Sequence, residues 1–471
     1  MTLVTFPELG TAWYVFEWLI RLVMLVVVPR RRAPTAAASW LLLIFFLPVP
    51  GLLLFLAIGS PKFPQWRSDR FRRLAPRADA LVARLAAAPA TLDGRDKDIA
   101  ALAQRLGRLP PVGGNAVALI DDYDGMIRQL IADIDGARRS VRLLVYIFAD
   151  DATGRAVIAA LARAVARGVA CHVLVDPVGS HRWVRGTLQL LRAAGVDVRT
   201  TLPMRLLRGR TRRDMRNHRK LFLIDGAIGY AGSQNIVDKD FRPGVVNREL
   251  VVRAEGPIVA EMDGLFVADW FLETEAMLDA APAIPPAAGP VTAQLLPSGA
   301  DFQRRGFETL LVWQLHQARH RAVIVTPYLI PNEDLLAAMQ TASLRGVEVH
   351  LVVSAVVDQA LVNLAQSSYY DELLRHGVRI HRFRDYLLHA KSVSIDGRLA
   401  IVGSSNVDIR SFQLNEEVSL LLFGADAAAP LDAIQRGYIA GSDELTLDAW
   451  RRRPTPRKIG ENLARLMSPL L

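Results

Sequence analysis

Cysteine is almost absent from this chain of 471 residues, and its scarcity excludes several classes of protein. The single cysteine, Cys171, can form neither an intrachain disulfide nor a multi-cysteine metal site. It lies in the apolar run VACHVLVD, which is typical of a buried strand. We therefore expect this thiol to pack in the core rather than to react.

Acidic residues are outnumbered, with 47 Asp and Glu against 57 Lys and Arg, which gives a formal net charge of +10. An excess of positive charge favours anionic partners: nucleic acid, an acidic lipid surface or phosphate esters. Charge alone does not choose among them. The length of the chain suggests about three structural units of roughly 150 residues each.

Charged residues are missing altogether from residues 36–58, which are long enough as a helix to cross the ~30 Å hydrocarbon layer of a membrane. Residues 11–28 form a weaker candidate, because Glu17 and Arg21 interrupt them, although the i, i+4 spacing lets these two pair. We predict a transmembrane helical hairpin over residues 1–60, its second helix more firmly than its first. The protein would then be multi-pass.

Three residues inside the second apolar segment disfavour a straight helix. Pro48, Pro50 and Gly51 would kink it or make it re-entrant. Arginines lie on both sides of this segment, so the positive-inside rule leaves the orientation open. A cleaved signal peptide does not fit, because no basic region precedes the first apolar stretch and a second one follows it.

The remainder of the chain repeats itself. An Arg- and Ala-rich stretch, residues 61–110, predicts a helical linker at the membrane surface. Strand-like and helix-like runs then alternate twice, and the tripeptide RGV at residues 167–169 recurs at 345–347. A duplication explains this pattern. It predicts an α/β fold of two lobes, residues 111–285 and 291–447, with mixed, mainly parallel sheets flanked by helices.

Two further segments complete the predicted organisation. The proline-rich stretch AAPAIPPAAGP, residues 280–290, predicts a linker between the lobes, so that a site at their shared face is expected. Residues 448–471 are basic and amphipathic. They fit either an interfacial segment at the membrane or a terminal helix packed on a lobe.

One set of polar residues recurs at the same spacing in both lobes. The two copies are His218, Lys220, Asp225, Ser233 and Asn235, and His389, Lys391, Asp396, Ser404 and Asn406. A lone histidine in an apolar strand is usually a core residue, but conservation of every interval between the copies indicates function. Side chains two apart in a strand project to one face, so each His and Lys should lie together. The Ser and Asn follow a glycine, where backbone N–H groups and short polar side chains can hold an oxyanion.

Two histidines and two lysines suit displacement at phosphorus. One neutral imidazole attacks the phosphorus atom, and the other, protonated, gives its proton to the leaving alkoxide. The lysines offset the charge that gathers on the phosphoryl oxygens. The histidines then exchange roles for the acceptor alcohol. Because lysines and N–H groups supply the positive charge, we expect neither a metal nor another cofactor.

The double H-x-K-x4-D pattern with its G-S-x-N tail resembles the phospholipase D superfamily over roughly residues 110–445. The resemblance implies that His218 is the nucleophile, which forms a phosphohistidine, and that His389 is the general acid. The residues themselves do not rank the two. It also implies a catalytic set that contains Lys220, Lys391, Asp225 and Asp396 besides the histidines, with the two aspartates structural in part.

A glutamate downstream of each motif orients the imidazole in that superfamily. By alignment through Asn247 and Asn415 it corresponds to Glu249 in VVNRELVV and Glu417 in QLNEEVSLL. A solvated charge on a strand is the alternative interpretation of both. The basic run that precedes the first motif, RLLRGRTRRDMRNHRK, could draw anionic headgroups toward His218, or could be an ordinary solvated loop.

Several longer stretches resemble bacterial cardiolipin synthases, among them EGPIVAEMDGLFVADWFLETEAML, TPYLIPNEDLLAAMQTASLRGV and GSSNVDIRSFQLNEEVSL. This resemblance implies a membrane-bound phosphatidyltransferase that makes cardiolipin and glycerol from two phosphatidylglycerol molecules. It also implies a multi-pass location in the bacterial inner membrane. The implied partners are the anionic phospholipid substrate and the bilayer, and no nucleic acid. A homo-oligomer stays open, since the lobes could pair within one chain or also between chains.

Three other functions compete with this interpretation. A nuclease of the same fold would use the basic run for the nucleic-acid backbone, but it does not require an apolar anchor, and no aromatic-interleaved basic platform is evident. A catalytically silent scaffold would be expected to lose a motif residue, yet both copies are complete. A different donor or acceptor, such as phosphatidylethanolamine or water, would keep the same chemistry.

Overall fold

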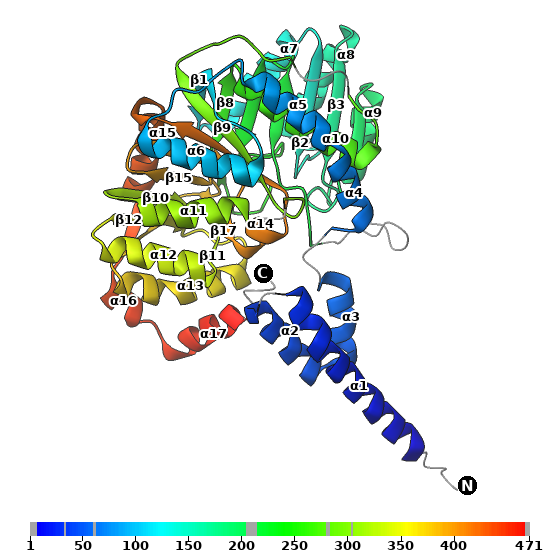
Figure 1. Cartoon of the computed structure of the whole chain (residues 1–471), viewed down its shortest axis with the longest axis vertical. Helices are drawn as coiled ribbons and strands as arrows, with labels where there is room; N and C mark the ends of the chain where they lie inside the picture. Colours follow the sequence, from blue (N-terminus) through cyan, green and yellow to red (C-terminus); the bar gives the residue numbers. More distant parts are fainter. Residues whose placement is uncertain are drawn as a thin grey trace.

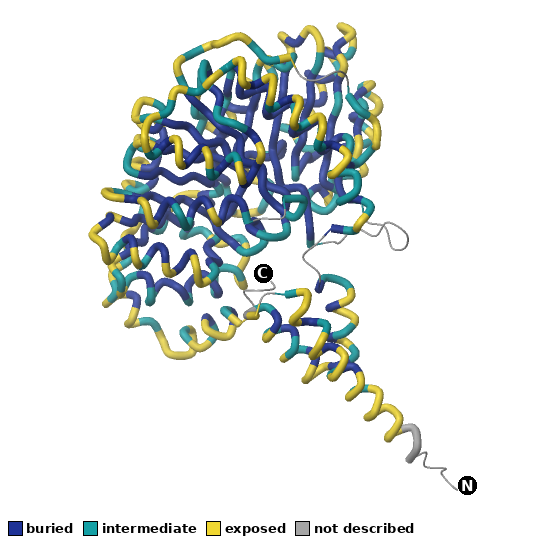
Figure 2. Tube along the Cα trace, viewed as in Figure 1, coloured by how far each residue is buried: buried dark blue, intermediate teal, exposed yellow. Residues whose placement is uncertain are grey.

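The computed structural model describes residues 7–32, 34–59, 63–203, 214–278, 283–302 and 305–466. An α/β body holds most of the chain, and a slender group of N-terminal helices projects from it (Figure 1). Buried strands form the middle of the body, and helices with exposed outer faces cover them (Figure 2).

The N-terminal group contains three helices: α1 (Pro7–Arg31), α2 (Pro34–Phe46) and α3 (Pro48–Ile58). Within the described residues, Gly10–Arg31 is the one helical stretch long and apolar enough to cross a membrane, and the helices of residues 36–46 and 48–58 are too short. Our ranking of the two apolar segments was therefore wrong. The weaker candidate forms the long helix, and the stronger one is broken.

The break falls at the prolines, as the sequence suggested. Leu47 precedes α3 with a non-helical backbone, and Pro48 begins that helix, where its missing N–H costs nothing. The chain turns back there, since a Cβ on Gly51 would lie 2.9 Å from the Cα of Ile44. The rings of Trp40 and Phe55 meet edge to face with centroids 5.2 Å apart. Residues 34–58 are thus a short helical hairpin packed against α1.

The predicted helical linker contains α4 (Gln65–Arg73), α5 (Ala75–Leu85) and α6 (Gly94–Gly107). These helices lie on the body, where α4 and α5 contact α10 (Ile258–Thr274) and α6 contacts β9 (Val291–Ser298). Arg67 of α4 is fully buried and forms ion pairs with Glu273 and Asp301 at 2.7 and 3.2 Å. This buried charge cluster fixes the first helix after the anchor to the body.

Fifteen strands of the described chain form one sheet that runs through both halves. In spatial order they are β19 (Ser442–Leu445), β13 (Arg379–Phe383), β12 (Glu348–Ser354), β10 (Arg321–Val325), β15 (Ser392–Ile395), β16 (Leu399–Gly403), β18 (Glu417–Phe423), β9 (Val291–Ser298), β1 (Val112–Ile120), β8 (Val251–Glu255), β6 (Ile228–Gly232), β5 (Leu221–Ile224), β2 (Ser140–Val145), β3 (Ala170–Val175) and β4 (Asp197–Thr200). The order of the two halves is mirrored about the β9–β1 pair, as a duplicated chain would give.

The mixed α/β fold is as predicted, but the strands are not mainly parallel. Among the described residues, four of the fourteen neighbouring pairs are parallel and ten are antiparallel. Parallel pairs need a crossover helix between the strands, as α8 (Ala152–Ala166) provides between β2 and β3. Strands around each motif are joined instead by tight turns, such as the one at Asp225, and pair antiparallel.

Helices cover both faces of the sheet. Those not yet described are α7 (Tyr123–Gly136), α9 (Val184–Ala193), α11 (Gly306–Gln317), α12 (Glu333–Leu344), α13 (Ala360–Arg375), α14 (Ile409–Gln413), α15 (Ala425–Ala440), α16 (Leu447–Arg451) and α17 (Thr455–Leu466). One hydrophobic core contains residues of both halves, for example Leu144 and Leu174 with Val323 and Val352. The two halves therefore share a core as well as a sheet.

The C-terminal segment packs on the body through α17, which lies along α13. Glu461 and Ala464 are buried in this contact, whereas Ile459, Leu463 and Leu466 are exposed. Of the two alternatives for this segment, the structure therefore shows the terminal helix packed on a lobe. One exposed edge of this helix is apolar.

Candidate active site

Each motif histidine lies in an extended segment that leads into a strand, rather than in the strand itself. His218 and Lys220 precede β5, and His389 and Lys391 lie between β14 (Leu387–Leu388) and β15. Apolar residues of β5 and β15 are buried in the sheet and hold these segments in place. The two histidines are brought together, and both line one cavity of about 210 Å³.

The segments meet because each half pairs its motif with the acidic segment of the other half. Leu387 and Leu388 pair in parallel with Asn247 and Arg248, which form β7. At the corresponding place, the N–H of His218 donates to the carbonyl of Glu416 at 2.8 Å. The N–H of His389 donates to the carbonyl of Arg248, also at 2.8 Å. Two short backbone ladders thus join the halves beside the cavity.

These ladders give each imidazole a carboxylate from the opposite half. Nδ1 of His218 lies 3.0 Å from Oε1 and 3.1 Å from Oε2 of Glu417. Nδ1 of His389 lies 2.8 Å from Oε1 of Glu249. Both carboxylates are buried. A carboxylate at Nδ1 fixes the tautomer with its proton on that nitrogen, so the lone pair of Nε2 is left for chemistry.

The motif serines lie behind these carboxylates instead of facing the cavity. Oγ of Ser404 donates to Oε2 of Glu417 at 2.5 Å and accepts from the N–H of Val418 at 3.0 Å. Oγ of Ser233 accepts from the N–H of Leu250 at 3.0 Å. Both serines are fully buried. Our prediction that Ser233 and Ser404 bind phosphate is therefore wrong: their hydroxyls are committed to the strands that carry Glu249 and Glu417.

The motif asparagines do line the cavity. Oδ1 of Asn235 accepts from the N–H of Ile147 at 3.0 Å, which leaves the amide N–H groups of Asn235 for the cavity. Asn406 lies at the matching position, and Asn247 and Asn415, which served only to align the glutamates, line the cavity as well. Four asparagine amides therefore line the cavity together with the two imidazoles.

The motif lysines are buried one layer behind the histidines. Nζ of Lys220 donates to the carbonyl of His218, and Nζ of Lys391 to the carbonyl of His389, each at 2.6 Å. Burial lowers the pKa of Lys220 to about 7 and that of Lys391 to about 8, although Glu417 and Glu249 oppose the shift. Each lysine thus fixes the backbone of the histidine two residues before it. Its ammonium group also brings a positive charge, which is lost near neutral pH.

Burial also dominates the ionisation of the imidazoles. It lowers the pKa of His218, and it lowers the pKa of His389 to about 4, against the attraction of the paired glutamates. Both rings are therefore neutral at pH 7 before substrate binds. Burial alone would raise the pKa of Glu249 and Glu417, but the paired histidines and nearby lysines lower it, so both stay ionised.

Several residues of the cavity escaped the sequence analysis. Tyr146 meets the ring of His218 edge to face at 4.7 Å, and Tyr328 meets that of His389 at 6.3 Å. The signal was the matching tyrosine in VYIF and PYLI, one in each half. Arg242 and Arg410 also line the cavity and add positive charge. Their signal was a matching position in the two copies, since each arginine lies five residues before the asparagine used for the alignment, Asn247 or Asn415.

The motif aspartates lie outside the cavity. Asp225 accepts hydrogen bonds from the backbone N–H groups of Arg138, Arg139 and Ser140 at 2.7–2.9 Å. Asp396 does the same for Arg319, His320 and Arg321 at 2.8–3.1 Å.

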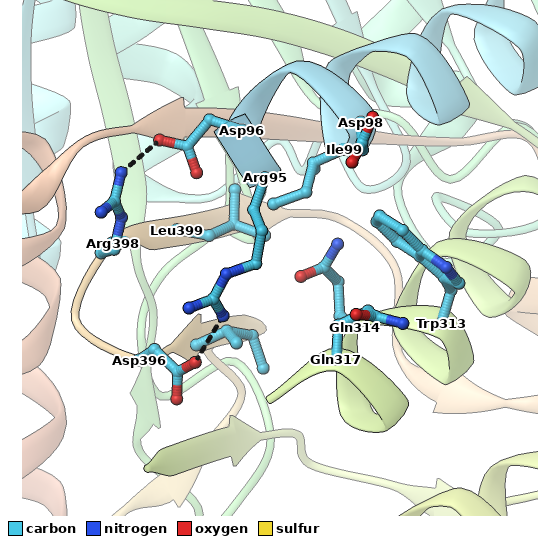
Figure 3. A pocket seen from close by; sticks show the side chains of 11 residues that line it. Arg95, Asp96, Asp98, Ile99, Trp313, Gln314, Gln317, Asp396, Arg398 and Leu399 are labelled. Carbon is cyan, nitrogen blue, oxygen red and sulfur yellow. Dashed lines mark hydrogen bonds and ion pairs between the residues drawn. The ribbon is translucent and has the colours of Figure 1, made fainter. Parts of the chain in front are cut away.

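The side chains around Asp396 also lie apart from the histidine cavity. They are Arg95 and the polar side chains of α6 and α11, in a separate pocket (Figure 3). Asp225 and Asp396 each tie the turn after a motif strand to the start of the adjacent strand, so assigning them to the catalytic set was wrong.

The basic run before the first motif is only partly described, and Arg205, Arg208, Arg210, Arg212 and Arg213 lie outside the described residues. The other two arginines are buried. Arg216 pairs with Asp176 at 2.8 Å, and Arg219 pairs with Asp269 and Glu416 at 2.6 Å. These two guanidinium groups stabilise the fold and are not available to draw headgroups.

Comparison with known proteins agrees with this geometry. A family model described as cardiolipin synthase, PLD-like domain, matches residues 130–270 and 311–436. Cardiolipin synthase A of Pectobacterium carotovorum subsp. carotovorum strain PC1 is 34% identical over 448 residues, and that of Proteus mirabilis strain HI4320 is 34% identical over 445 residues. Each alignment covers 91% of both chains.

A solved structure supports the fold. The phosphatidylserine synthase of Haemophilus influenzae Rd KW20 has a TM-score of 0.59 at 13% identity, and the match covers 79% of this chain and 98% of the other. At that identity the likeness concerns the fold alone. Together with the paired motifs and the sequence relatives, these matches show that the chain belongs to the cardiolipin synthase family, whose members are enzymes of the phospholipase D superfamily.

Proposed function

We propose that this protein transfers a phosphatidyl group from one phosphatidylglycerol molecule to the headgroup of another, making cardiolipin and releasing glycerol. The single observation that carries the proposal is the shared cavity of His218 and His389, each with a glutamate at Nδ1. Relatives of similar length are cardiolipin synthases, which supports the choice of phospholipid as substrate.

The first half-reaction breaks the bond between phosphorus and the headgroup glycerol. Nε2 of His218 attacks the phosphorus atom, and the glycerol oxygen leaves with a proton from Nε2 of His389. His389 acquires that proton when the substrate binds, because a phosphodiester anion beside an imidazole raises its pKa. The products are free glycerol and a phosphatidyl group on His218.

The second half-reaction restores the enzyme. A headgroup hydroxyl of a second phosphatidylglycerol gives its proton to His389, and its oxygen attacks the phosphorus and displaces His218. The amides of Asn235, Asn406 and their neighbours and the guanidinium groups of Arg242 and Arg410 surround the cavity and suit stabilisation of the phosphoryl oxygens. Lys220 and Lys391 add positive charge from the layer behind.

The N-terminal helices fit an anchor that holds this site at the bilayer. We infer that α1 crosses the membrane and that the shorter hairpin of α2 and α3 inserts beside it, because residues such as Trp13, Leu22, Phe46 and Leu53 are exposed and apolar. Instead of the two crossing helices that we expected from the sequence, this arrangement has one long crossing helix, α1, and a shorter hairpin beside it. The exposed edge of α17 suits contact with the same surface.

A reconstitution in which phosphatidylglycerol is the sole lipid tests the function. Purified full-length protein is added to phosphatidylglycerol vesicles with a chelator, and the products are identified by mass. We expect cardiolipin and glycerol in equal amounts. Phosphatidic acid without cardiolipin would make water the acceptor, and no product from phosphatidylglycerol would contradict the proposed donor.

A further inference from the structure

A second cavity lies outside the histidine site. It has a volume of about 340 Å³ and lies among α4, α5, the C-terminal end of α6 and α10. Its wall shares no residue with the histidine cavity and consists mainly of Ala, Leu, Val, Phe, Gly, Met and Pro side chains. A cavity of this size and lining has room for a small apolar ligand and offers few partners to water.

The helix α5 lies across α10 and approaches it closely at Gly264. A Cβ on Gly264 of α10 would lie 2.5 Å from Cδ2 of Leu81, so glycine is what lets α5 come so near there. Beside this contact, the small side chains of Ala75, Ala78 and Ala80 leave space above α10. Larger residues at these positions would fill the gap.

Two arginines supply the polar part of the wall. Arg77 and Arg108 line the cavity, and the described wall contains no carboxylate. Both are exposed, and neither guanidinium is ion-paired within the described residues. An apolar hollow with two free cations at its rim is complementary to a molecule that has an apolar chain and an anionic head.

The position of the cavity favours a membrane lipid as that molecule. Phe71 of α4 and Leu74, the residue that caps α4, line the cavity. The helix α4 is the first helix after the N-terminal group, and it lies on the side of the body that faces this group (Figure 1). The rings of Phe71 and Phe302 meet at 5.5 Å in the wall. The wall of the cavity therefore begins with the helix that follows the anchor directly in the chain.

We propose that this cavity holds one acyl chain of an anionic phospholipid, with the phosphate of its headgroup at Arg77 and Arg108. The bound lipid is not a reacting molecule, since the histidine cavity is separate. It attaches the body to the bilayer through α4 and α5. The wall also contacts the motif indirectly, because the guanidinium of Arg219 lies 5.9 Å from the centre of the Phe302 ring.

Photolabelling tests the site independently of turnover. Full-length protein carrying His218→Ala is placed in nanodiscs with phosphatidylglycerol that bears a diazirine in one acyl chain, and the adducts are located by mass spectrometry. We expect adducts on residues of α5 and α10. Ala78→Trp should reduce them at least tenfold, whereas Ala83→Trp, on the exposed side of α5, should leave them within twofold.

The same photolabelling assay tests the role of the two arginines in the wall. Arg77→Glu and Arg108→Glu should each lower labelling several-fold, and Arg84→Glu, an exposed arginine of α5 outside the wall, should not. Diazirine-labelled phosphatidylcholine should label the site more weakly than phosphatidylglycerol. Equal labelling by both lipids, or adducts that persist in Ala78→Trp, would overturn the proposal. Because His218 is absent, these results do not depend on the transfer reaction.

Discussion

Glu417 of the second half lies 3.0 Å from Nδ1 of His218 in the first half. The reverse pair, Glu249 with His389, has the matching contact at 2.8 Å. Each half therefore supplies the imidazole of one pair and the carboxylate of the other. Neither half contains a complete His–Glu pair, so the duplicated chain is one catalytic unit and not two.

Replacing the carboxylate tests the role of this pair. Glu417→Gln keeps the shape of the side chain but removes the charge that orients His218 and stabilises its protonated form. We expect kcat to fall by about 10²–10⁴-fold, as for other imidazoles that lose an orienting carboxylate. Initial rates in phosphatidylglycerol vesicles measure this. Glu333→Gln, at an exposed position, is the control, and a Glu417→Gln variant with more than a tenth of the rate would contradict the role.

The lowered pKa values of Lys220 and Lys391 predict that activity falls at alkaline pH. Lys220, with a pKa of about 7, and Lys391, with a pKa of about 8, carry a proton below those values and lose it above them. Because the protonated form offsets phosphoryl charge, kcat/KM should fall as the pH rises from about 7 to 9. Lys220→Arg, which keeps its charge, should retain activity further into that range. A flat profile for the unaltered protein would refute the assignment.

The motif aspartates should matter for stability rather than for catalysis. Asp225 and Asp396 occupy left-handed backbone at φ of 56° and 53°, which asparagine tolerates, so Asp→Asn changes mainly the hydrogen bonds. Loss of a charged acceptor for three N–H groups should cost about 1–3 kcal/mol each. Thermal unfolding measures this cost, and kcat should stay within twofold.

For Asp396 the cost should depend on pH. Burial opposes ionisation, but the backbone N–H groups lower the pKa of this carboxyl below its usual value. The stabilisation is therefore present above the unfolded pKa and is lost as the pH falls through the folded pKa. The difference between the unaltered protein and Asp396→Asn should shrink in acid. A difference that stays constant would contradict this origin.

Arg67 should be among the most sensitive positions of the linker helices. Arg67→Met leaves Glu273 and Asp301 without their buried partner, which should destabilise the protein by about 3–5 kcal/mol at neutral pH. Both carboxyls already have a raised pKa because of burial, so they can take up protons and the cost should fall toward pH 5. Denaturant unfolding measures it. Arg72→Met, at an exposed residue of the same helix, should cost little.

The sequence predicted what local spacing determines. The His-x-Lys pattern placed both motifs, their repetition indicated the duplication, and the downstream glutamates were found by alignment to each motif. Pro48 predicted the break in the apolar segment, because a proline cannot continue a helix without losing a hydrogen bond. The segment that forms α1 was ranked below the second one because Glu17 and Arg21 were counted as interruptions, although they pair at 3.3 Å along the helix.

What the sequence did not predict depends on contacts between distant segments. The exchange of glutamates follows from the pairing of β14 with β7, which joins residues about 140 positions apart. The serines could not be separated from the asparagines, because only the fold shows that Ser404 faces Glu417 while Asn406 faces the cavity. Antiparallel pairing around the motifs was missed because the alternation of strands and helices hides the tight turns.

The most direct measurement is the rate of cardiolipin formation by His218→Ala, His389→Ala and the double variant, each checked for an unchanged melting temperature. If the two imidazoles act on one phosphodiester, each single variant should lose essentially all activity, and the double variant should be no slower than the slower single one. Substantial turnover in either single variant, or losses that multiply in the double variant, would contradict a shared two-histidine site.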